Sequence, residues 1–119
     1  MTSLEFTNAV CKLLNDKKAV DIKAIYVGGR SSLADYFVIA SGRSTSMVSA
    51  LEDEVYDKMA QQDKKPSRIE GTSSNTWVLM DYGDVLVHLF LEESREFYGL
   101  ERLWADAPQV DLSGILTQD

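Results

Sequence analysis

Three acidic side chains are the first candidates for chemistry in this chain. Asp35, Asp81 and Asp84 could bind a magnesium ion if the fold brought their carboxylates together. Metal-dependent nucleotidyl transfer usually uses two carboxylates that alternate on one strand face, as in Asp-x-Asp. Asp35 is instead followed by Tyr36 and Phe37, so this pair is missing. The other two aspartates flank a short Tyr-Gly pair, where Asp is favoured for backbone reasons alone. We therefore predict no metal site.

The other residues that could do chemistry lack the partners or the spacing that such chemistry needs. His88 is the single histidine, and Glu92 is too far along a strand to orient it as a general base. We expect this histidine to be hydrogen-bonded on a sheet face. Residues 28–32, Gly-Gly-Arg-Ser-Ser, lack the spacing of a phosphate-binding loop and predict a plain turn. Cys11 lies off the apolar stripe of its helix and is interpreted as a small inert residue. These patterns favour a binding domain without a cofactor over an enzyme.

The composition is that of one soluble globular domain. The chain has 119 residues, of which 45% are hydrophobic and 26% charged. One cysteine excludes an internal disulfide framework, and no apolar run approaches the roughly 20 residues of a membrane span. The start of the chain does not resemble a secretory signal. We therefore expect a cytoplasmic protein that has no contact with membranes.

The net charge of −7 is concentrated in the second half of the chain. Residues 1–69 contain nine acidic and ten basic residues, whereas residues 70–119 contain ten acidic residues and two arginines. An acidic half repels phosphate backbones and is steered towards basic partners. Direct binding of nucleic acid, which needs a footprint of Lys and Arg, is disfavoured.

Hydrophobic periodicity predicts an α/β (α+β) fold built on a single mixed sheet covered by helices. The expected elements are a helix over 3–18, strands over 20–27 and 35–41, a helix over 45–63, strands over 68–70, 76–81 and 85–91, and a short helix after Ser94. A tight hairpin joins the last two strands, and the long crossover helix implies one parallel strand pair. We expect an ordered domain over residues 1–107 and a flexible C-terminal tail over residues 108–119.

Three segments together resemble the ribosomal silencing factor family, also called Iojap-like. They are residues 31–42 (SSxxDYFVIxSG), residues 77–88 (WVLxDYGDVxVH) and residues 93–104 (ESRxFYxLExLW), and the likeness spans about residues 3–107. The resemblance implies a nucleotidyltransferase-like fold without transferase activity. It also implies that the protein docks on the large ribosomal subunit through ribosomal protein L-fourteen. The bound protein would then block joining of the small subunit sterically and reduce translation.

The acidic half and this resemblance together predict a docking surface on the hairpin. The candidate residues are Trp77, Leu79, Asp81, Tyr82, Asp84 and Glu70. The first three share one side of a strand because side chains alternate, whereas Tyr82 and Asp84 are expected to project from the turn. Core packing is the alternative role for Trp77 and Leu79. A further set, Tyr98, Leu100 and Trp104, is expected to clamp the last segment onto the sheet, with ribosome contact as its second possible role.

Two other functions remain open at this point. A metal-dependent nucleotidyltransferase is suggested by the implied fold, although the Asp-x-Asp pair is missing. A homodimer with a self-complementary hairpin face is the other alternative.

Overall fold

One five-stranded mixed sheet forms the centre of the computed structural model, which describes residues 1–116. The strands are β1 (Val20–Tyr26), β2 (Tyr36–Gly42), β3 (Arg68–Glu70), β4 (Trp77–Asp81) and β5 (Val85–Leu91). Their spatial order is β1-β2-β5-β4-β3. The β2–β5 pair is parallel and the other pairs are antiparallel. The predicted mixed sheet, its hairpin and its parallel pair are thereby confirmed.

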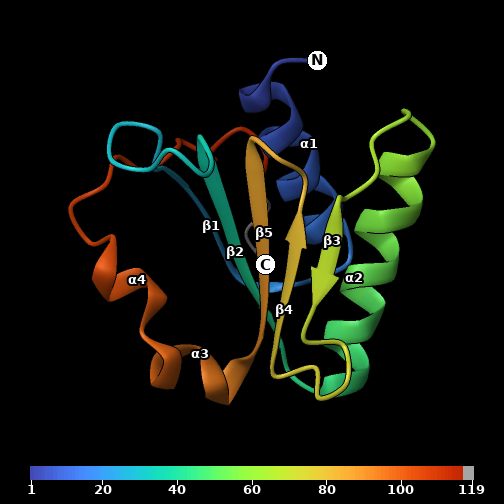
Figure 1. The fold of residues 1–119 in the computed structure, drawn as a ribbon. Helices are drawn as coiled ribbons and strands as arrows, with labels where there is room; N and C mark the ends of the chain where they lie inside the picture. The colour runs from blue at the N-terminus through green and yellow to red at the C-terminus, as the bar shows by residue number, and fades with distance from the viewer. Residues whose placement is uncertain (117–119) are drawn as a thin grey trace.

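Four helices cover the sheet unequally (Figure 1). The long helices α1 (Ser3–Asp16) and α2 (Thr45–Ala60) pack side by side on one face. The short helices α3 (Glu92–Tyr98) and α4 (Leu100–Leu103) lie on the other face. Within residues 1–116, no helix has the length and apolarity needed to cross a membrane.

The two long helices begin at side-chain caps. Thr2 followed three residues later by Glu5 predicts a capping box, and Ser44 or Thr45 is the predicted cap of the second helix. The Thr2 hydroxyl accepts a hydrogen bond from the backbone N–H of Glu5, whose carboxylate accepts one from the Thr2 N–H, which completes a capping box. The Ser44 hydroxyl caps α2 by accepting from the N–H of Met47. Helical spacing predicts an inner stripe of Val48, Leu51, Val55 and Met59 on α2, and all four side chains are buried.

Helix α1 corrects the expected position of the cysteine. Helical spacing predicts a stripe of Phe6, Val10, Leu13 and Leu14. Phe6, Val10 and Leu14 are buried and Leu13 is half-buried, but Cys11 is also fully buried against the sheet. A wider apolar stripe than the one we assigned therefore faces the core. Burial raises the pKa of the Cys11 thiol to about 12, so this group stays protonated at neutral pH and is not a nucleophile.

The short helices turn at a glycine and correct a second apolar stripe. Helix α3 starts at Glu92 rather than after Ser94, and Gly99 separates it from α4 with a φ of 66°, in the left-handed region. Leu100 is buried, whereas Leu103 is 74% exposed. The spacing of residues 100, 103 and 104 predicts one apolar stripe. This prediction is wrong at Leu103, because α4 ends after four residues and its last side chain faces solvent.

The segment after Pro108 packs along the outer edge of β1. The Tyr26 N–H donates to the Pro108 carbonyl at 2.8 Å, and the Val110 N–H donates to the Ala24 carbonyl at 2.8 Å. The Leu112 side chain is 7% exposed and belongs to the core beneath α1 and α2. These contacts correct our expectation that packing ends at Pro108. The flexibility of residues 108–119 stays a prediction, and residues 117–119 lie outside the described part.

We predict that Leu112→Ala lowers the free energy of unfolding by about 2 kcal/mol, because it removes a buried side chain from the core. Urea denaturation of the full chain measures this effect. Gln109→Ala, at an exposed position of the same segment, is the matched control and is expected to change stability by less than about 0.5 kcal/mol. Equal stability of the two variants would contradict the packing of this segment.

Candidate docking face

Half of one sheet face is left uncovered by helices. The strand registers pair Arg68 with Asp81, Glu70 with Leu79, and Leu79 with His88, so these side chains share that face. The α3–α4 segment covers the part of this face over β1 and β2, where it packs on Phe37. Among the described residues, no helix lies across the part over β3 and β4, and α3 reaches it through the Tyr98 ring, which contacts Trp77. We call this area the open face; it consists of Arg68, Glu70, Trp77, Leu79 and Asp81.

Trp77 forms the apolar end of the open face. Its ring stacks on Phe90 with the centroids 5.0 Å apart and contacts the Tyr98 ring at 4.8 Å. Its indole N–H donates to Nδ1 of His88 at 3.1 Å. The indole donor is therefore used inside the protein, and the half-buried ring offers apolar surface to a partner. Both roles considered for Trp77, packing and exposure, are present in one side chain.

His88 lies next to this tryptophan and is held in one neutral tautomer. Because an indole N–H can only donate, Nδ1 must accept, and the proton of the neutral ring lies on Nε2. Nε2 is buried and finds no hydrogen-bond partner among the described residues. Burial lowers the pKa of His88 to about 4, so the ring is uncharged at neutral pH. The predicted hydrogen-bonded histidine on a sheet face is confirmed.

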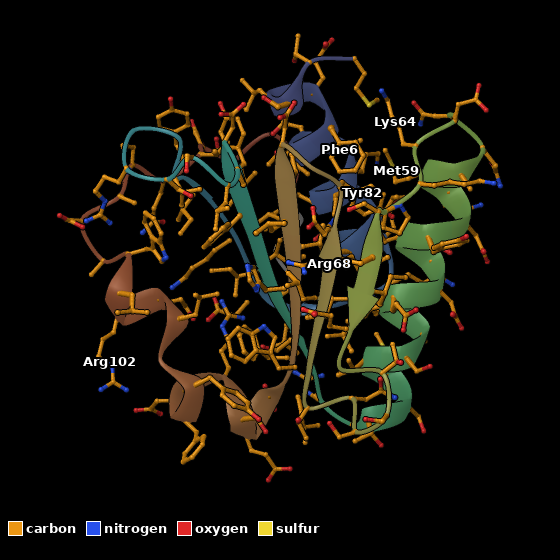
Figure 2. The ribbon with its side chains drawn as sticks, viewed as in Figure 1. Phe6, Met59, Lys64, Arg68, Tyr82 and Arg102 are labelled. Atoms are coloured by element: carbon orange, nitrogen blue, oxygen red, sulfur yellow. The ribbon has the colours of Figure 1, made fainter. Side chains whose placement is uncertain are left out.

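An arginine that sequence reasoning missed lies among the acidic residues of the open face (Figure 2). Arg68 Nε lies 3.3 Å from Asp81 Oδ2, and Arg68 Nη1 lies 3.9 Å from Glu70 Oε1. The other oxygen of Asp81 accepts from the Gly83 N–H at 2.8 Å, as expected of an aspartate that starts a turn. The open face is therefore less acidic than predicted. Alternation along Arg68-Ile69-Glu70 could have identified the arginine, because residues 68 and 70 share a side.

Two of the predicted docking residues lie away from the open face. The Tyr82 ring folds back onto Phe6 with the centroids 4.8 Å apart, on the face that α1 and α2 cover (Figure 2). Burial raises the pKa of Tyr82 to about 12, and nearby Tyr56 and Glu52 add to this shift. The expectation that Tyr82 projects from the turn is therefore wrong, because Phe6 provides an apolar contact for the ring. Asp84 is exposed at the turn, and its carbonyl accepts from the Asp35 N–H at 2.7 Å.

The further set of predicted residues, Tyr98, Leu100 and Trp104, lies in three different environments. Tyr98 is 41% exposed and joins the open face through its contact with Trp77. Leu100 is 9% exposed and packs between α4 and the sheet. Trp104 packs edge-on against Phe37 at 5.4 Å, and the Arg30 guanidinium lies 4.6 Å from its ring centroid. Tyr98 alone of the three continues the open face, whereas the other two clamp the segment to the covered half.

A buried arginine fixes the α3–α4 segment over the covered half of the sheet. Arg95 is 8% exposed; its Nε donates to Glu101 Oε1 at 2.6 Å and its Nη1 donates to Ser41 Oγ at 3.0 Å. Glu101 also accepts from Lys23 Nζ on β1 at 3.0 Å. Burial raises the pKa of Glu101, but hydrogen bonds from Arg95 and Lys23 outweigh it and leave this pKa below its ordinary value. Sequence reasoning assigned Arg95 no role, although an arginine between apolar anchors is a candidate for such a clamp.

Two features that catalytic sites often use, a metal-binding group of side chains and a phosphate-binding turn, are not found among the described residues. Within residues 1–116, no three His, Cys, Asp or Glu side chains are grouped so as to hold a metal ion. In the turn at residues 28–32, the N–H groups of Gly28, Arg30 and Ser31 donate to backbone carbonyls, so they are not free to bind phosphate. An apolar surface with ionic neighbours is suited to binding another protein.

The chain is similar to known proteins of one family. The family model described as "Ribosomal silencing factor during starvation" matches residues 1–119. A protein of Halalkalibacterium halodurans named Ribosomal silencing factor RsfS is 38% identical over 117 residues, which cover 98% of this chain and 100% of that protein. A mouse protein named Mitochondrial assembly of ribosomal large subunit protein 1 is 37% identical over 95 residues, which cover 77% of this chain and 42% of the mouse protein. The crystal structure of a Chromobacterium violaceum protein superposes with a TM-score of 0.85 at 33% identity and covers 88% of each chain.

The neutral, buried state of His88 predicts a pH dependence of stability. As pH falls below about 6.5, the unfolded chain binds a proton at this residue, while the folded protein does not do so until about pH 4. Stability is therefore retained above pH 6.5, and about 2–3 kcal/mol is lost between pH 7 and pH 4.5. In His88→Gln, the amide oxygen can still accept from Trp77 but does not titrate. Urea denaturation across this range should give a flatter profile for the variant, and identical slopes would contradict the assignment.

Removing the arginine clamp should destabilise the fold. We expect Arg95→Ala to lower the free energy of unfolding by about 3 kcal/mol, because it leaves Glu101 without its arginine partner and Ser41 without its donor. Arg102→Ala is the control on the neighbouring helix, since Arg102 points to solvent and donates only to the Glu96 carbonyl (Figure 2). Thermal or urea unfolding compares the two variants. Similar losses in both would show that the buried network does not fix the segment.

Proposed function

The chain belongs to the ribosomal silencing factor family, and from this premise we propose that it represses translation by binding the large ribosomal subunit and preventing the small subunit from joining. We further propose that it does so in the cytoplasm, that ribosomal protein L-fourteen is the docking partner, and that no chemical step is involved. The name of the mouse relative, which refers to the ribosomal large subunit, favours this subunit as the target.

The open face is the single observation that carries this proposal. A partner that binds there would cover the ring of Trp77 and the half-buried side chain of Leu79, and it would complete the layer that α3 and α4 leave unfinished. Hydrophobic surface at the centre of such a contact provides affinity, whereas charged neighbours select the partner. The opposite face is covered by two long helices and offers no comparable area of sheet.

The charges around the open face favour a basic partner. The carboxylates of Glu70 and Asp81 share Arg68 as their counter-ion within the free protein. A cationic group of the partner would compete for these carboxylates and displace the arginine towards solvent. Because ion pairs of this exposed kind are screened by salt, they contribute to the association rate more than to final affinity.

A nucleotidyltransferase is disfavoured by the same geometry. The Asp81 carboxylate is already committed to the Gly83 N–H and to Arg68, so it is a poor metal ligand. Calorimetry with magnesium and a nucleotide tests this alternative, and saturable heat would support it. A second copy of the chain is another possible occupant of the open face, and light scattering across a dilution series measures it.

We predict that Leu79→Ser weakens binding to large subunits by about 2 kcal/mol, or roughly 30-fold, as expected at the centre of an interface. This variant is preferable to Trp77→Ala, which would also disturb Phe90, Tyr98 and His88. Co-sedimentation with purified large subunits in sucrose gradients at several protein concentrations gives the affinities.

Tyr56→Ser on α2 is the control, since Tyr56 is 37% exposed and α2 covers the opposite face of the sheet. Its affinity should equal that of the wild type. Failure of the wild-type protein to co-sediment at moderate salt would overturn the proposed function. Normal affinity of a folded Leu79→Ser variant would overturn the assignment of the open face.

A further inference from the structure

An aromatic ring on α3 is almost fully exposed to water. Phe97 is 84% exposed, and its ring contacts the Tyr98 ring edge-on with the centroids 5.5 Å apart. Large apolar side chains are mostly buried, and an isolated exception has little meaning. This ring is not isolated, because Tyr98 contacts Trp77 at 4.8 Å on the open face. The three rings form a continuous series from β4 to the outer surface of α3.

The ring is not required by the fold. Helix α3 is held to the sheet by Arg95, through Ser41 and Glu101, and by Tyr98, through Trp77 and Phe90. Phe97 contributes little to either attachment, since most of its surface faces solvent in the folded protein. A polar residue at this position would leave the core unchanged and would remove an apolar group from water.

Three exposed acidic side chains lie on the same short helix as this ring. Glu92, Glu93 and Glu96 are all exposed. The two arginines of the segment do not neutralise them: Arg95 is buried against Glu101, and Arg102 donates to the Glu96 backbone carbonyl rather than to a carboxylate. The outer surface of α3 therefore combines an apolar ring with three carboxylates, whereas the carboxylates of the open face have an arginine among them.

We propose that Phe97 and Tyr98, with Glu92, Glu93 and Glu96 around them, form a second docking element that extends the open face onto α3. We call it the α3 anchor. Its partner is a basic protein surface in which an apolar pocket accepts the Phe97 ring and lysine or arginine side chains at the rim meet the three glutamates. This inference rests on the proposed function, because the partner is taken to be a protein of the large ribosomal subunit.

Two features favour a basic protein over other occupants. The carboxylates repel RNA phosphates and anionic lipid headgroups, which excludes the other polyanionic surfaces that an exposed aromatic ring could approach. The series of rings from Trp77 through Tyr98 to Phe97 makes the anchor continuous with the open face, so one partner can cover both. Aromatic side chains that enter apolar pockets inside an interface typically dominate its affinity.

The test compares Phe97→Ser with Leu33→Ser in the full-length chain. Leu33 is 79% exposed in the β1–β2 loop and is matched to Phe97 in its exposure and apolar character. We expect Phe97→Ser to raise the dissociation constant for purified large subunits about tenfold or more, and Leu33→Ser to change it less than about twofold. Both variants should keep the wild-type unfolding midpoint, because neither side chain is buried.

The outcomes separate this inference from the proposed function. If the wild-type protein does not bind large subunits, the proposed function fails. If the wild type binds and Phe97→Ser binds equally well, the α3 anchor fails while the proposed function stands. Wild-type affinity for protein-free ribosomal RNA equal to that for the intact subunit would overturn the assignment of a basic protein as the partner.

A second variant tests the acidic rim. Glu93→Gln combined with Glu96→Gln removes two charges and keeps similar side-chain shapes. We expect a slower association rate and a weaker salt dependence of that rate, with little change in the dissociation rate. An unchanged salt dependence would contradict the proposed complementarity between the glutamates and the rim of the partner's pocket.

Discussion

The shape of the candidate docking face depends on the buried hydrogen bonds and ion pair of Arg95. Its guanidinium group lies buried between α3, β1 and β2, where it binds Glu101 and Ser41 while Lys23 binds Glu101 from β1. These contacts fix the short helices over the β1–β2 half of the sheet. Within residues 1–116, the β3–β4 half is then left with the half-exposed side chains of Trp77 and Leu79, which the helices cover only at Trp77, through the Tyr98 ring. We propose that a partner completes this unfinished layer.

The two faces of the sheet carry different side chains, because successive side chains along a strand point to opposite faces. One face packs against α1 and α2 and forms the larger core, which includes Val78, Met80 and Leu89. The other face carries Trp77, Leu79 and His88, and the neutral His88 holds Trp77 by accepting a hydrogen bond from its indole N–H. The larger core and the proposed docking surface thus lie on opposite faces, and Trp77 both packs internally and belongs to the open face. The two acidic areas also differ: Arg68 pairs with the carboxylates of the open face, whereas no ion pair to the glutamates of α3 is found among the described residues.

Much of the fold could be predicted from local pattern. The buried stripe of α2, the Thr2 and Ser44 caps, and the hairpin between β4 and β5 follow from periodicity and turn chemistry, and all are confirmed. The shared side of Trp77, Leu79 and Asp81 also follows from alternation, whereas Glu70 joins them through the register between β3 and β4, which the sequence does not give. Tyr82 could not be placed in this way, because the side to which a turn residue folds depends on a distant contact, here Phe6. Arg95, the Leu112 contact and the position of Arg68 between two carboxylates likewise arise from tertiary pairing between separate elements.

We propose that the open face, and not the helical face, holds this protein on the large ribosomal subunit. A difference map of purified large subunits with and without the bound protein is the most direct test. We expect added density whose β3–β4 half lies against a basic ribosomal protein, at a position that overlaps the surface used by the small subunit. Density attached through α1 and α2, or located away from the subunit-joining surface, would contradict it.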